Sequence, residues 1–342
     1  MMSDKKTVNV TKIKRGISFA IGLSVVAIVI LVSYSAAPET WVSLCQIKIN
    51  FLLLALLCLV SMWLLEGVGF GLLIHGVGKF IPFLSLVRIF LASNFVGFVT
   101  PFGSGGVPAQ IYLLTKKGLS AGESTAVVST RALLSSWFFG IIGLVAFFLL
   151  RPHLSLKSSW IDFFGPTLVA LFLFTLLFLY LLWRPQKGGH LASACCSWSP
   201  LVRCFGTERM KRIQTSIAHE IEKLHQGLSL LFRSNFLMVL AVAGCIILCW
   251  LLLFAIAPLL LLGFGVKINV VQVLFYQFVL FFLIPLSPTP GGSGAAELGF
   301  AALLTSLVPK HLLAVFVILW RFLTYYLNLV VGGIILVLFL RK

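Results

Sequence analysis

The chain has 342 residues, of which 60% are apolar and only 10% are charged, and its mean hydropathy is +1.10. Soluble domains carry about 25% charged residues, so this composition excludes an ordinary soluble protein and predicts an integral membrane protein. The net charge of +17 does not indicate a nucleic-acid partner, because the basic residues flank apolar segments, as they do in membrane proteins.

Six apolar runs reach the length of about 20 residues that a helix needs to cross a bilayer. The first follows a basic flank, as a signal peptide would, but it is longer than a signal-peptide core of about 7–15 residues. Pro38 also follows one of the two tolerable cleavage patterns, so we expect an uncleaved anchor. The runs lie at residues 16–35, 51–75, 125–150, 162–183, 235–263 and 311–339.

Two further apolar blocks, 85–117 and 270–308, are each interrupted by a turn rich in glycine and proline. The limb that follows the first turn, 107–114, is too short to cross, because eight helical residues span only about 12 Å. A broken helix is stable within a bilayer only where its freed backbone groups face protein, water or a ligand. We therefore predict that both blocks are re-entrant helical hairpins.

The two turns form an internal repeat. The sequence TPFGSG at residues 100–105 returns as TPGGSG at residues 289–294, and an arginine follows each turn after nearly the same interval, Arg131 in one case and Arg321 in the other. Paired broken segments in two halves of a chain are a sequence pointer to a transport site. The predicted repeat units are residues 51–150 and 235–339.

The distribution of lysine and arginine predicts the topology. With both termini in the cytoplasm and both hairpins re-entrant, most basic residues lie inside, in agreement with the positive-inside rule. Three crossings separate the hairpins, so the hairpins enter from opposite sides and the repeat is inverted. The residues expected outside are Lys48, Arg151, Lys157, Lys267 and Lys310.

The basic loop at residues 184–233 is expected in the cytoplasm, and within it apolar residues recur at steps of three or four. This spacing predicts an amphipathic helix, which either lies on the anionic inner leaflet or packs against the bundle. The apolar stripe consists of Met210, Ile213, Ile217, Ile221, Leu224, Leu228 and Leu231.

Four ionisable residues lie in otherwise apolar segments, where each would cost about 3 kcal/mol at the bilayer centre. They are Glu66, Arg131, Glu297 and Arg321. Two acids and two bases can neutralise one another, so one interpretation is a set of buried salt bridges that fix the helix packing. Glu297 stands three residues after the second turn, whereas Pro108 takes the corresponding position in the first repeat.

A second interpretation is a binding site for an anionic headgroup. A new half-helix begins after each turn, and its free N–H groups and positive dipole end suit an anion. Together with Arg131 and Arg321, these ends predict a site for a phosphodiester, in which Glu297 neutralises a headgroup amine or carries a coupling proton. The other candidate residues are Gly103, Ser104, Gly105, Pro290, Gly291, Gly292, Ser293, Gly294, Thr100, Thr289, Asn94, Gln110 and Glu66.

No catalytic motif competes with this interpretation. The sequence contains no Walker motif, no DxD signature and no HExxH pair, and its longest polar segment is too short for a nucleotide-using domain. His190 with Cys195, Cys196 and Cys204 lacks the ligand spacing of a zinc site. We therefore expect no catalytic residue, no metal and no cofactor.

Residues 94–137 and 285–333 resemble the lysylphosphatidylglycerol synthase transmembrane-region family, a flippase-like membrane module also found ahead of a soluble lysyltransferase domain. The family's Pro-Gly-Gly and glutamate match Pro290, Gly291, Gly292 and Glu297, and its following arginine matches Arg321. The resemblance covers residues 15–340. It implies a bacterial or archaeal inner-membrane protein that handles a lipid with a modified headgroup. The chain ends at Lys342 without a soluble synthase domain, so aminoacyl transfer is not expected.

The sequence thus predicts an all-α, polytopic membrane protein, a single membrane domain over residues 1–342 with about six full transmembrane helices and two re-entrant hairpins. The expected function is that of a flippase for a phospholipid or polyprenyl-phosphate-type lipid, with aminoacylated phosphatidylglycerol among the candidates. The expected partners are membrane lipids and not nucleic acid. Two alternatives stay open: a membrane subunit that presents lipid to a lysyltransferase or glycosyltransferase, and a small-solute transporter.

Overall fold

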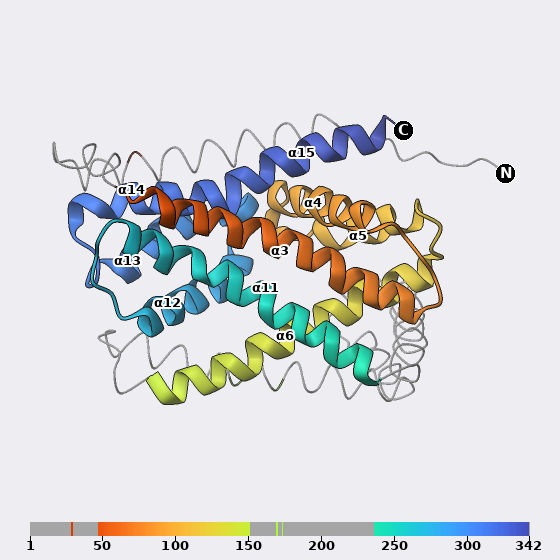
Figure 1. Ribbon diagram of the computed structural model, residues 1–342, viewed down its shortest axis with the longest axis horizontal. Helices are drawn as coiled ribbons and strands as arrows, with labels where there is room; N and C mark the ends of the chain where they lie inside the picture. The colour runs from red at the N-terminus through yellow and green to blue at the C-terminus, as the bar shows by residue number, and fades with distance from the viewer. Residues whose placement is uncertain (1–28, 30–46, 151–168, 170–172, 174–235, 342) are drawn as a thin grey trace, which may run out of the picture. The chain divides into compact units, whose positions relative to one another are not determined.

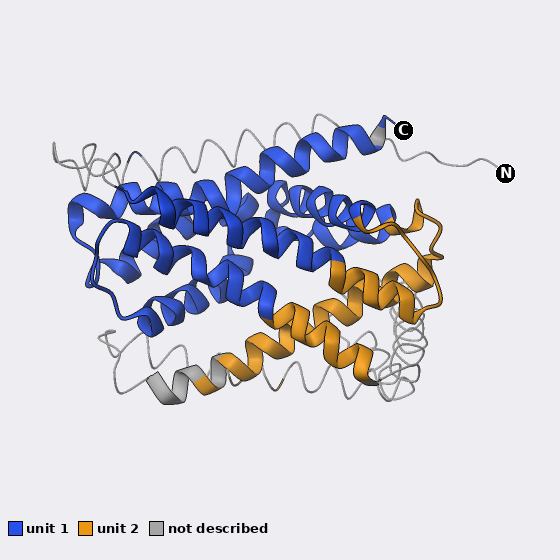
Figure 2. Cartoon of the chain, in the orientation of Figure 1, with its two compact units in different colours: residues 1–67, 84–113, 248–342 blue, residues 68–83, 114–247 orange. Residues whose placement is uncertain are grey.

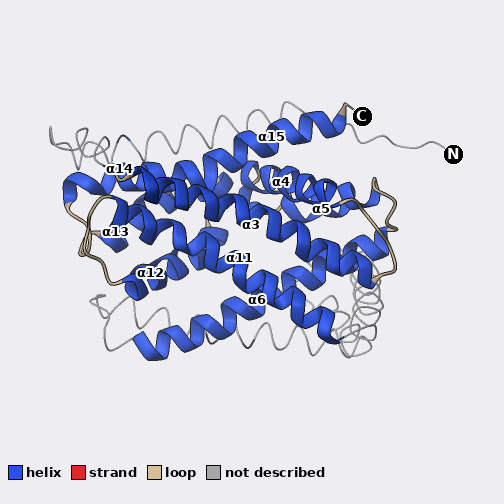
Figure 3. Ribbon diagram, viewed as in Figure 1, coloured by secondary structure: helices blue, strands red, loops and turns tan. Residues whose placement is uncertain are grey.

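The computed structural model describes residues 47–150 and 236–341, together with the single positions 29, 169 and 173. Every regular element within this part of the chain is a helix (Figure 3), which confirms the predicted all-α class. The predicted spans at 16–35 and 162–183 fall outside the described residues apart from those single positions. The basic loop at 184–233 with its amphipathic helix also falls outside them.

The longest elements of the described part are apolar helices (Figure 1). They are α3 (Ile49–Gly76), α6 (Ala121–Leu150), α11 (Phe236–Gly263) and a continuous helix made of α14 (Lys310–Arg321), η5 (Phe322–Tyr326) and α15 (Leu327–Leu340). Each contains a stretch long and apolar enough to cross a membrane. These stretches match four of the six predicted spans, so the chain is a multi-pass membrane protein.

Shorter helices occupy the two interrupted blocks. The first block contains α4 (Phe83–Val99), the short turn η1 (Pro101–Gly103) and α5 (Gly106–Thr115). The second contains α12 (Val270–Leu283), the turns η3 (Ile284–Leu286) and η4 (Pro290–Gly292), and α13 (Ala295–Leu304). Both α5 and α13 have 10 residues, so each is about 15 Å long and cannot cross a bilayer. Each block is therefore a helix, a turn and a half-helix, as the hairpin prediction requires.

The chain divides into two compact units (Figure 2). Unit 1 comprises residues 1–67, 84–113 and 248–342, and unit 2 comprises residues 68–83 and 114–247. Both glycine- and proline-rich turns belong to unit 1, which therefore holds most of the predicted site. The predicted boundaries of the repeat units, 51–150 and 235–339, stay predictions.

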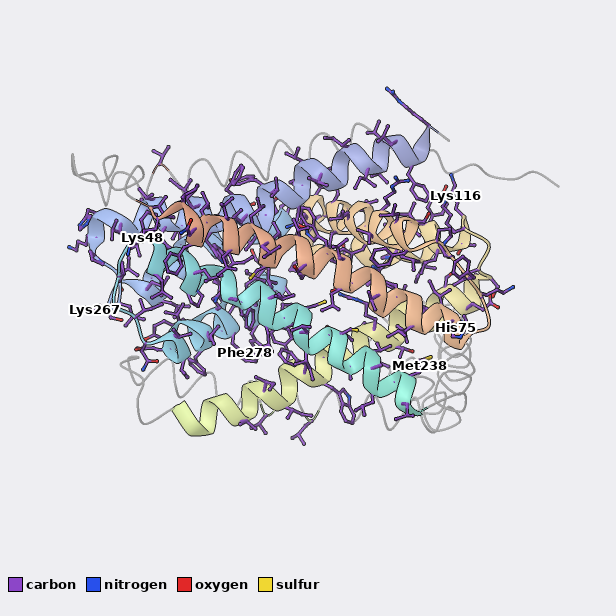
Figure 4. The ribbon with its side chains drawn as sticks, in the orientation of Figure 1. Lys48, His75, Lys116, Met238, Lys267 and Phe278 are labelled. Carbon is purple, nitrogen blue, oxygen red and sulfur yellow. The ribbon has the colours of Figure 1, made fainter. Side chains whose placement is uncertain are left out.

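Within unit 1, α3 and α11 run antiparallel. The Lys48 backbone N–H, just before α3, donates to the carbonyl of Gly263 at the end of α11 at 3.0 Å. Cys249 Sγ lies 3.8 Å from the carbonyl oxygen of Met62. Lys48 and Lys267 lie at the same end of these helices (Figure 4), as expected if both are on one side of the membrane. Which side this end faces stays a prediction.

Glycines allow a close contact between two helices of unit 1. A Cβ at Gly332 of α15 would overlap the carbonyl oxygen of Leu91 on α4, and a Cβ at Gly333 would lie 3.0 Å from the Phe95 ring. Small residues permit such close approach between membrane helices. This contact holds the first hairpin, through α4, against the last helix of the second half.

Aromatic rings pack between α12, α13 and α14. The Trp320 ring on α14 lies 4.5 Å from the Phe300 ring on α13 and 6.3 Å from the Phe281 ring on α12, measured between centroids. Trp320 and Phe300 are completely buried. Edge and tilted ring packing of this kind adds to the hydrophobic stabilisation of a core. It fixes α13, and therefore the second turn, against α14.

Candidate functional site

The two turns of the repeat lie against each other in unit 1. η1 packs against η3 and η4, and Tyr325 reaches across both turns. Its hydroxyl donates to the carbonyl of Phe98, just before the first turn, at 3.5 Å, and its ring lies 5.1 Å from the Phe98 ring. The same ring packs so closely on Gly291 of the second turn that a Cβ there would overlap it. The structure thus brings together the two segments that the sequence repeat had paired.

The backbones of the two turns are almost the same. Phe102 has φ 55° and ψ 15°, and Gly291, its counterpart, has φ 60° and ψ 17°. Gly103 and Gly292 both have φ 66°. Ser104 and Ser293 donate their N–H groups to Pro101 and Pro290, each at 3.1 Å. The repeat is therefore a repeat of conformation as well as of sequence up to the serine, where ψ differs, −23° at Ser104 and 136° at Ser293.

A buried ion pair lies beside the second turn. Arg321 Nε donates to Glu297 Oε1 at 2.9 Å, and the two side chains are 5% and 0% exposed. Arg321 Nη2 donates to the carbonyl of Gly291 at 2.7 Å. The guanidinium carbon lies 4.1 Å from the centre of the Tyr325 ring. The predicted neutralisation of acids by bases is confirmed for this pair, and the arginine also holds the turn itself.

Glu297 has a second contact, with the start of its own helix. The Gly294 N–H donates to Glu297 Oε2 at 2.7 Å, and Glu297 lies in the first turn of α13. A carboxylate in this position satisfies a free N–H group and interacts favourably with the positive end of the helix dipole. The anion at this half-helix end is therefore the protein's own side chain.

The first turn is held differently. The Gly105 N–H, the counterpart of the Gly294 N–H, donates to the hydroxyl of Thr100 at 2.9 Å. Pro108 stands where Glu297 would be. The turn is also more open, because Phe102 is 56% exposed whereas Pro290, Gly292 and Ser293 are buried.

Arg131, the counterpart of Arg321, belongs to unit 2. Its guanidinium lies 5.5 Å from the centre of the Phe70 ring, and the side chain is only partly buried. The two arginines of the repeat therefore have different surroundings.

The remaining predicted residues of unit 1 have mixed environments. Glu66 on α3 and Gln110 on α5 are buried, and Asn94 on α4 is half-buried. Thr289 donates its hydroxyl to the carbonyl of Ser293 at 2.9 Å, so it shapes the second turn. Ser104 does the same in the first turn by donating to Pro101 at 2.9 Å. A lipid-binding role for these residues stays a prediction.

Sequence reasoning missed Tyr325 and Asn328. Tyr325 lies in the π-helical turn η5, and Asn328 follows it. The Asn328 amide donates to the carbonyls of Leu323 and Thr324 at 3.4 and 3.0 Å, and its oxygen accepts from the Trp63 indole at 2.8 Å. A polar residue within an apolar span was an available signal, but a π-helix has no sequence signature that would have placed it.

No cluster of three or more His, Cys, Asp or Glu side chains that could hold a metal ion occurs among the described residues. The segment with His190 and Cys195 lies outside the described part of the chain, so that pattern has no structural account.

Comparison with known proteins gives one family and one curated relative. The family described as "Lysylphosphatidylglycerol synthase TM region" matches residues 17–332. A curated protein of Archaeoglobus fulgidus, described as "UPF0104 membrane protein", is 26% identical over 317 residues, which cover 91% of this chain and 93% of the relative. Both turns, both repeat arginines and Glu297 lie within the family match.

Proposed function

Because the chain belongs to the Lysylphosphatidylglycerol synthase TM region family, we propose that it is an integral membrane translocator that moves an anionic lipid between leaflets. The substrate class is a phospholipid or polyprenyl-phosphate-type lipid, with aminoacylated phosphatidylglycerol as a specific candidate. In this proposal the chain is a transporter and not an enzyme.

The observation that supports this proposal most strongly is the contact between the two turns. Broken helices within a membrane protein are stable where they line a site, and paired broken helices mark the site in many transporters. Here η1 and η4 lie together, and Tyr325 contacts both turns. A headgroup that crosses the bilayer needs polar groups on its path, and in this proposal the two turns supply them through their backbone and their hydroxyl side chains.

Arg321 favours an anionic headgroup. A guanidinium presents several N–H donors in one plane, which suits phosphate oxygens better than any other side chain does. The guanidinium is almost completely removed from solvent, where an electrostatic interaction is stronger than in water. A phosphodiester that displaced Glu297 from the guanidinium would replace one anion with another.

The family description names a synthase, which favours a second candidate function. In that case the chain presents lipid to a lysyltransferase or glycosyltransferase encoded separately. This function requires lipid binding but not movement between leaflets, so one assay separates the two.

The test is a leaflet-resolved assay with the purified chain in liposomes that contain labelled phosphatidylglycerol, lysyl-phosphatidylglycerol or a polyprenyl phosphate. We expect at least one label to exchange between leaflets faster than in protein-free liposomes, and Gly292→Val to abolish the exchange because it places a side chain at φ 66° against Ile284. No exchange for any headgroup, with folded protein, would rule out the translocator and leave the lipid-presenting function.

We also propose that the protein lies in a bacterial or archaeal cytoplasmic membrane with both termini inside. Single cysteines at positions 209 and 267 in a cysteine-free background test this. Only position 267 should react with an impermeant reagent from outside intact cells. Reaction at position 209 would contradict the inverted topology.

A further inference from the structure

The Glu297 carboxylate holds the groups that a lipid phosphate would need at the second turn. Its Oε1 accepts from Arg321 Nε at 2.9 Å, and its Oε2 accepts from the Gly294 N–H at 2.7 Å. A phosphate at a helix N-terminus beside an arginine binds through these same two kinds of donor. The carboxylate and a phosphate therefore compete for one place.

A second observation at the same turn points to a ligand. Ser293, next to Gly294, is 1% exposed, and its hydroxyl oxygen makes no hydrogen bond of acceptable geometry within the described part of the chain. The Tyr325 hydroxyl is near enough to interact with the Ser293 hydroxyl but is not in hydrogen-bond geometry with it, and the Tyr325 ring stacks on the Arg321 guanidinium. Buried hydroxyl groups are normally hydrogen-bonded, so an unpartnered one calls for an explanation. A bound phosphate oxygen would accept this hydrogen bond.

We propose that Glu297 is an internal competitor for the lipid headgroup. In the empty protein its carboxylate takes the place of the headgroup phosphate, and the arriving phosphate displaces it from Arg321 and the Gly294 N–H and accepts from Ser293. This inference rests on the proposed function, because it assigns an anionic phosphodiester lipid to the same site. Its consequence is weak binding: the carboxylate lowers the affinity for the phosphate and drives its release.

The alternative role of Glu297, binding a headgroup amine, predicts the opposite effect of a mutation. If Glu297 contacts an amine, removal of its charge weakens binding of an aminoacylated lipid and does nothing for phosphatidylglycerol, which has no amine. If Glu297 competes with the phosphate, removal of its charge leaves Arg321 unneutralised and strengthens the binding of phosphatidylglycerol. The sign of the change in affinity decides between the two roles.

The experiment measures the dissociation constant of phosphatidylglycerol, with diacylglycerol as the probe that lacks the phosphate, for the purified full chain in neutral detergent. Lipid-dependent thermal unfolding gives the constant. The variants are Glu297→Gln, Ser293→Ala and, as a matched control, Glu123→Gln. Glu123 also caps a helix, since the Ser120 N–H donates to its Oε2 at 2.7 Å, but it belongs to unit 2.

We expect Glu297→Gln to bind phosphatidylglycerol at least about tenfold more tightly than the wild type, which corresponds to the loss of one charged competitor. Ser293→Ala should bind it about three- to tenfold more weakly while the lipid-free midpoint of unfolding changes little, because the structure gives this hydroxyl no hydrogen bond of acceptable geometry. Glu123→Gln and the diacylglycerol probe should show no change.

Equal or weaker phosphatidylglycerol binding by folded Glu297→Gln would overturn the proposal, even if the wild-type chain moves lipid in liposomes. If Glu297→Gln binds phosphatidylglycerol more tightly but the wild type moves no lipid, the competitor role of Glu297 stands and the translocator function is rejected. Should Glu297→Gln fail to elute as a folded species, Ser293→Ala decides alone, and unchanged affinity in that variant would also overturn the proposal.

Discussion

The first and second turns of the repeat share a backbone but not the side chains that hold it. Thr100, a neutral hydroxyl, accepts the Gly105 N–H in the first turn, whereas Glu297, a carboxylate, accepts the corresponding Gly294 N–H in the second. In the second turn the buried Arg321 also donates to the carbonyl of Gly291. The two motifs thus share a conformation as far as the serine, while residues outside the motif make the surroundings of the second turn charged.

The comparison also explains why the motifs differ at one position. The second residue of each turn has a positive φ, and Phe102 is the only residue other than glycine with such an angle in the described part of the chain. Phe102 is strained at this angle, but its side chain is exposed, so it meets no such overlap as a side chain at position 291 would. Its counterpart must be glycine because the Tyr325 ring fills the space of a side chain at position 291.

The largest expected effect on stability comes from removing the charge of Arg321, which is buried beside the second turn. Arg321→Gln removes the cation that neutralises the completely buried Glu297 carboxylate and should lower the free energy of unfolding by about 3–5 kcal/mol. Arg131→Gln, the matched change in the first half, affects a side chain that is only partly buried and should cost less, about 1 kcal/mol, because water screens the charge of such a group. Denaturant unfolding of the two variants in detergent measures the difference. Equal losses would mean that the two halves do not differ in this way.

A second pair of variants changes the two equivalent residues with positive φ, Gly291 and Phe102. Gly291→Ala adds both strain and overlap with Tyr325 and should destabilise the protein by about 2–3 kcal/mol. Phe102→Gly relieves the strain at φ 55° and should stabilise it by about 1 kcal/mol. Thermal unfolding in detergent checks both signs. Phe102→Ala, which keeps the strain, is the control and should not stabilise the protein.

The third prediction concerns η5, the π-helical turn between α14 and α15. α6, the long helix after the first turn, is α-helical throughout, whereas η5 interrupts the helix after the second turn. Asn328→Ala leaves the Trp63 indole N–H and the Thr324 carbonyl without their partner and should cost about 2 kcal/mol.

Asn94→Ala is the matched amide for this change, because Asn94 is half-buried on α4 of the first half. It should cost less than about 1 kcal/mol. A larger loss for Asn94→Ala than for Asn328→Ala would show that η5 does not depend on its asparagine.

The smallest change in stability is expected when the Tyr325 hydroxyl is removed, which donates to the carbonyl just before the first turn. Tyr325→Phe removes the donor to Phe98 at 3.5 Å, a long hydrogen bond, and keeps the ring on Arg321. It should change the free energy of unfolding by less than about 0.5 kcal/mol. A loss above about 1.5 kcal/mol would mean that this hydroxyl holds the turns together.

Much of the fold could be predicted from the sequence, because the bilayer imposes helix length and the repeat marks the breaks. The predicted spans at 51–75 and 235–263 lie within one or two residues of α3 and α11. The two hairpin blocks were predicted because glycine and proline leave visible interruptions. The Glu297–Arg321 pair was also foreseen as one alternative, since an isolated buried charge is unfavourable.

What could not be predicted depends on local geometry between distant segments. The sequence does not reveal that Glu297 caps its own helix, because a glutamate three residues after a turn can also point away from it. The role of Tyr325 depends on the π-helical turn, which changes the face that the tyrosine presents. Asn328 and Trp63 are 265 positions apart, so only the packed structure reveals their contact.

The most direct test of lipid movement at the second turn uses the double variant Glu297→Gln with Arg321→Gln. Removing both charges restores electroneutrality, so the double variant should recover much of the stability that Arg321→Gln loses. The measurement is the initial rate of labelled phosphatidylglycerol exchange between leaflets, compared among wild type, the double variant and Arg131→Gln in the same liposomes. We predict a folded double variant that exchanges the lipid at least about tenfold more slowly than wild type, the factor that corresponds to about 1.4 kcal/mol. A folded double variant that exchanges lipid at the wild-type rate would contradict the account, because the pair would then serve packing alone.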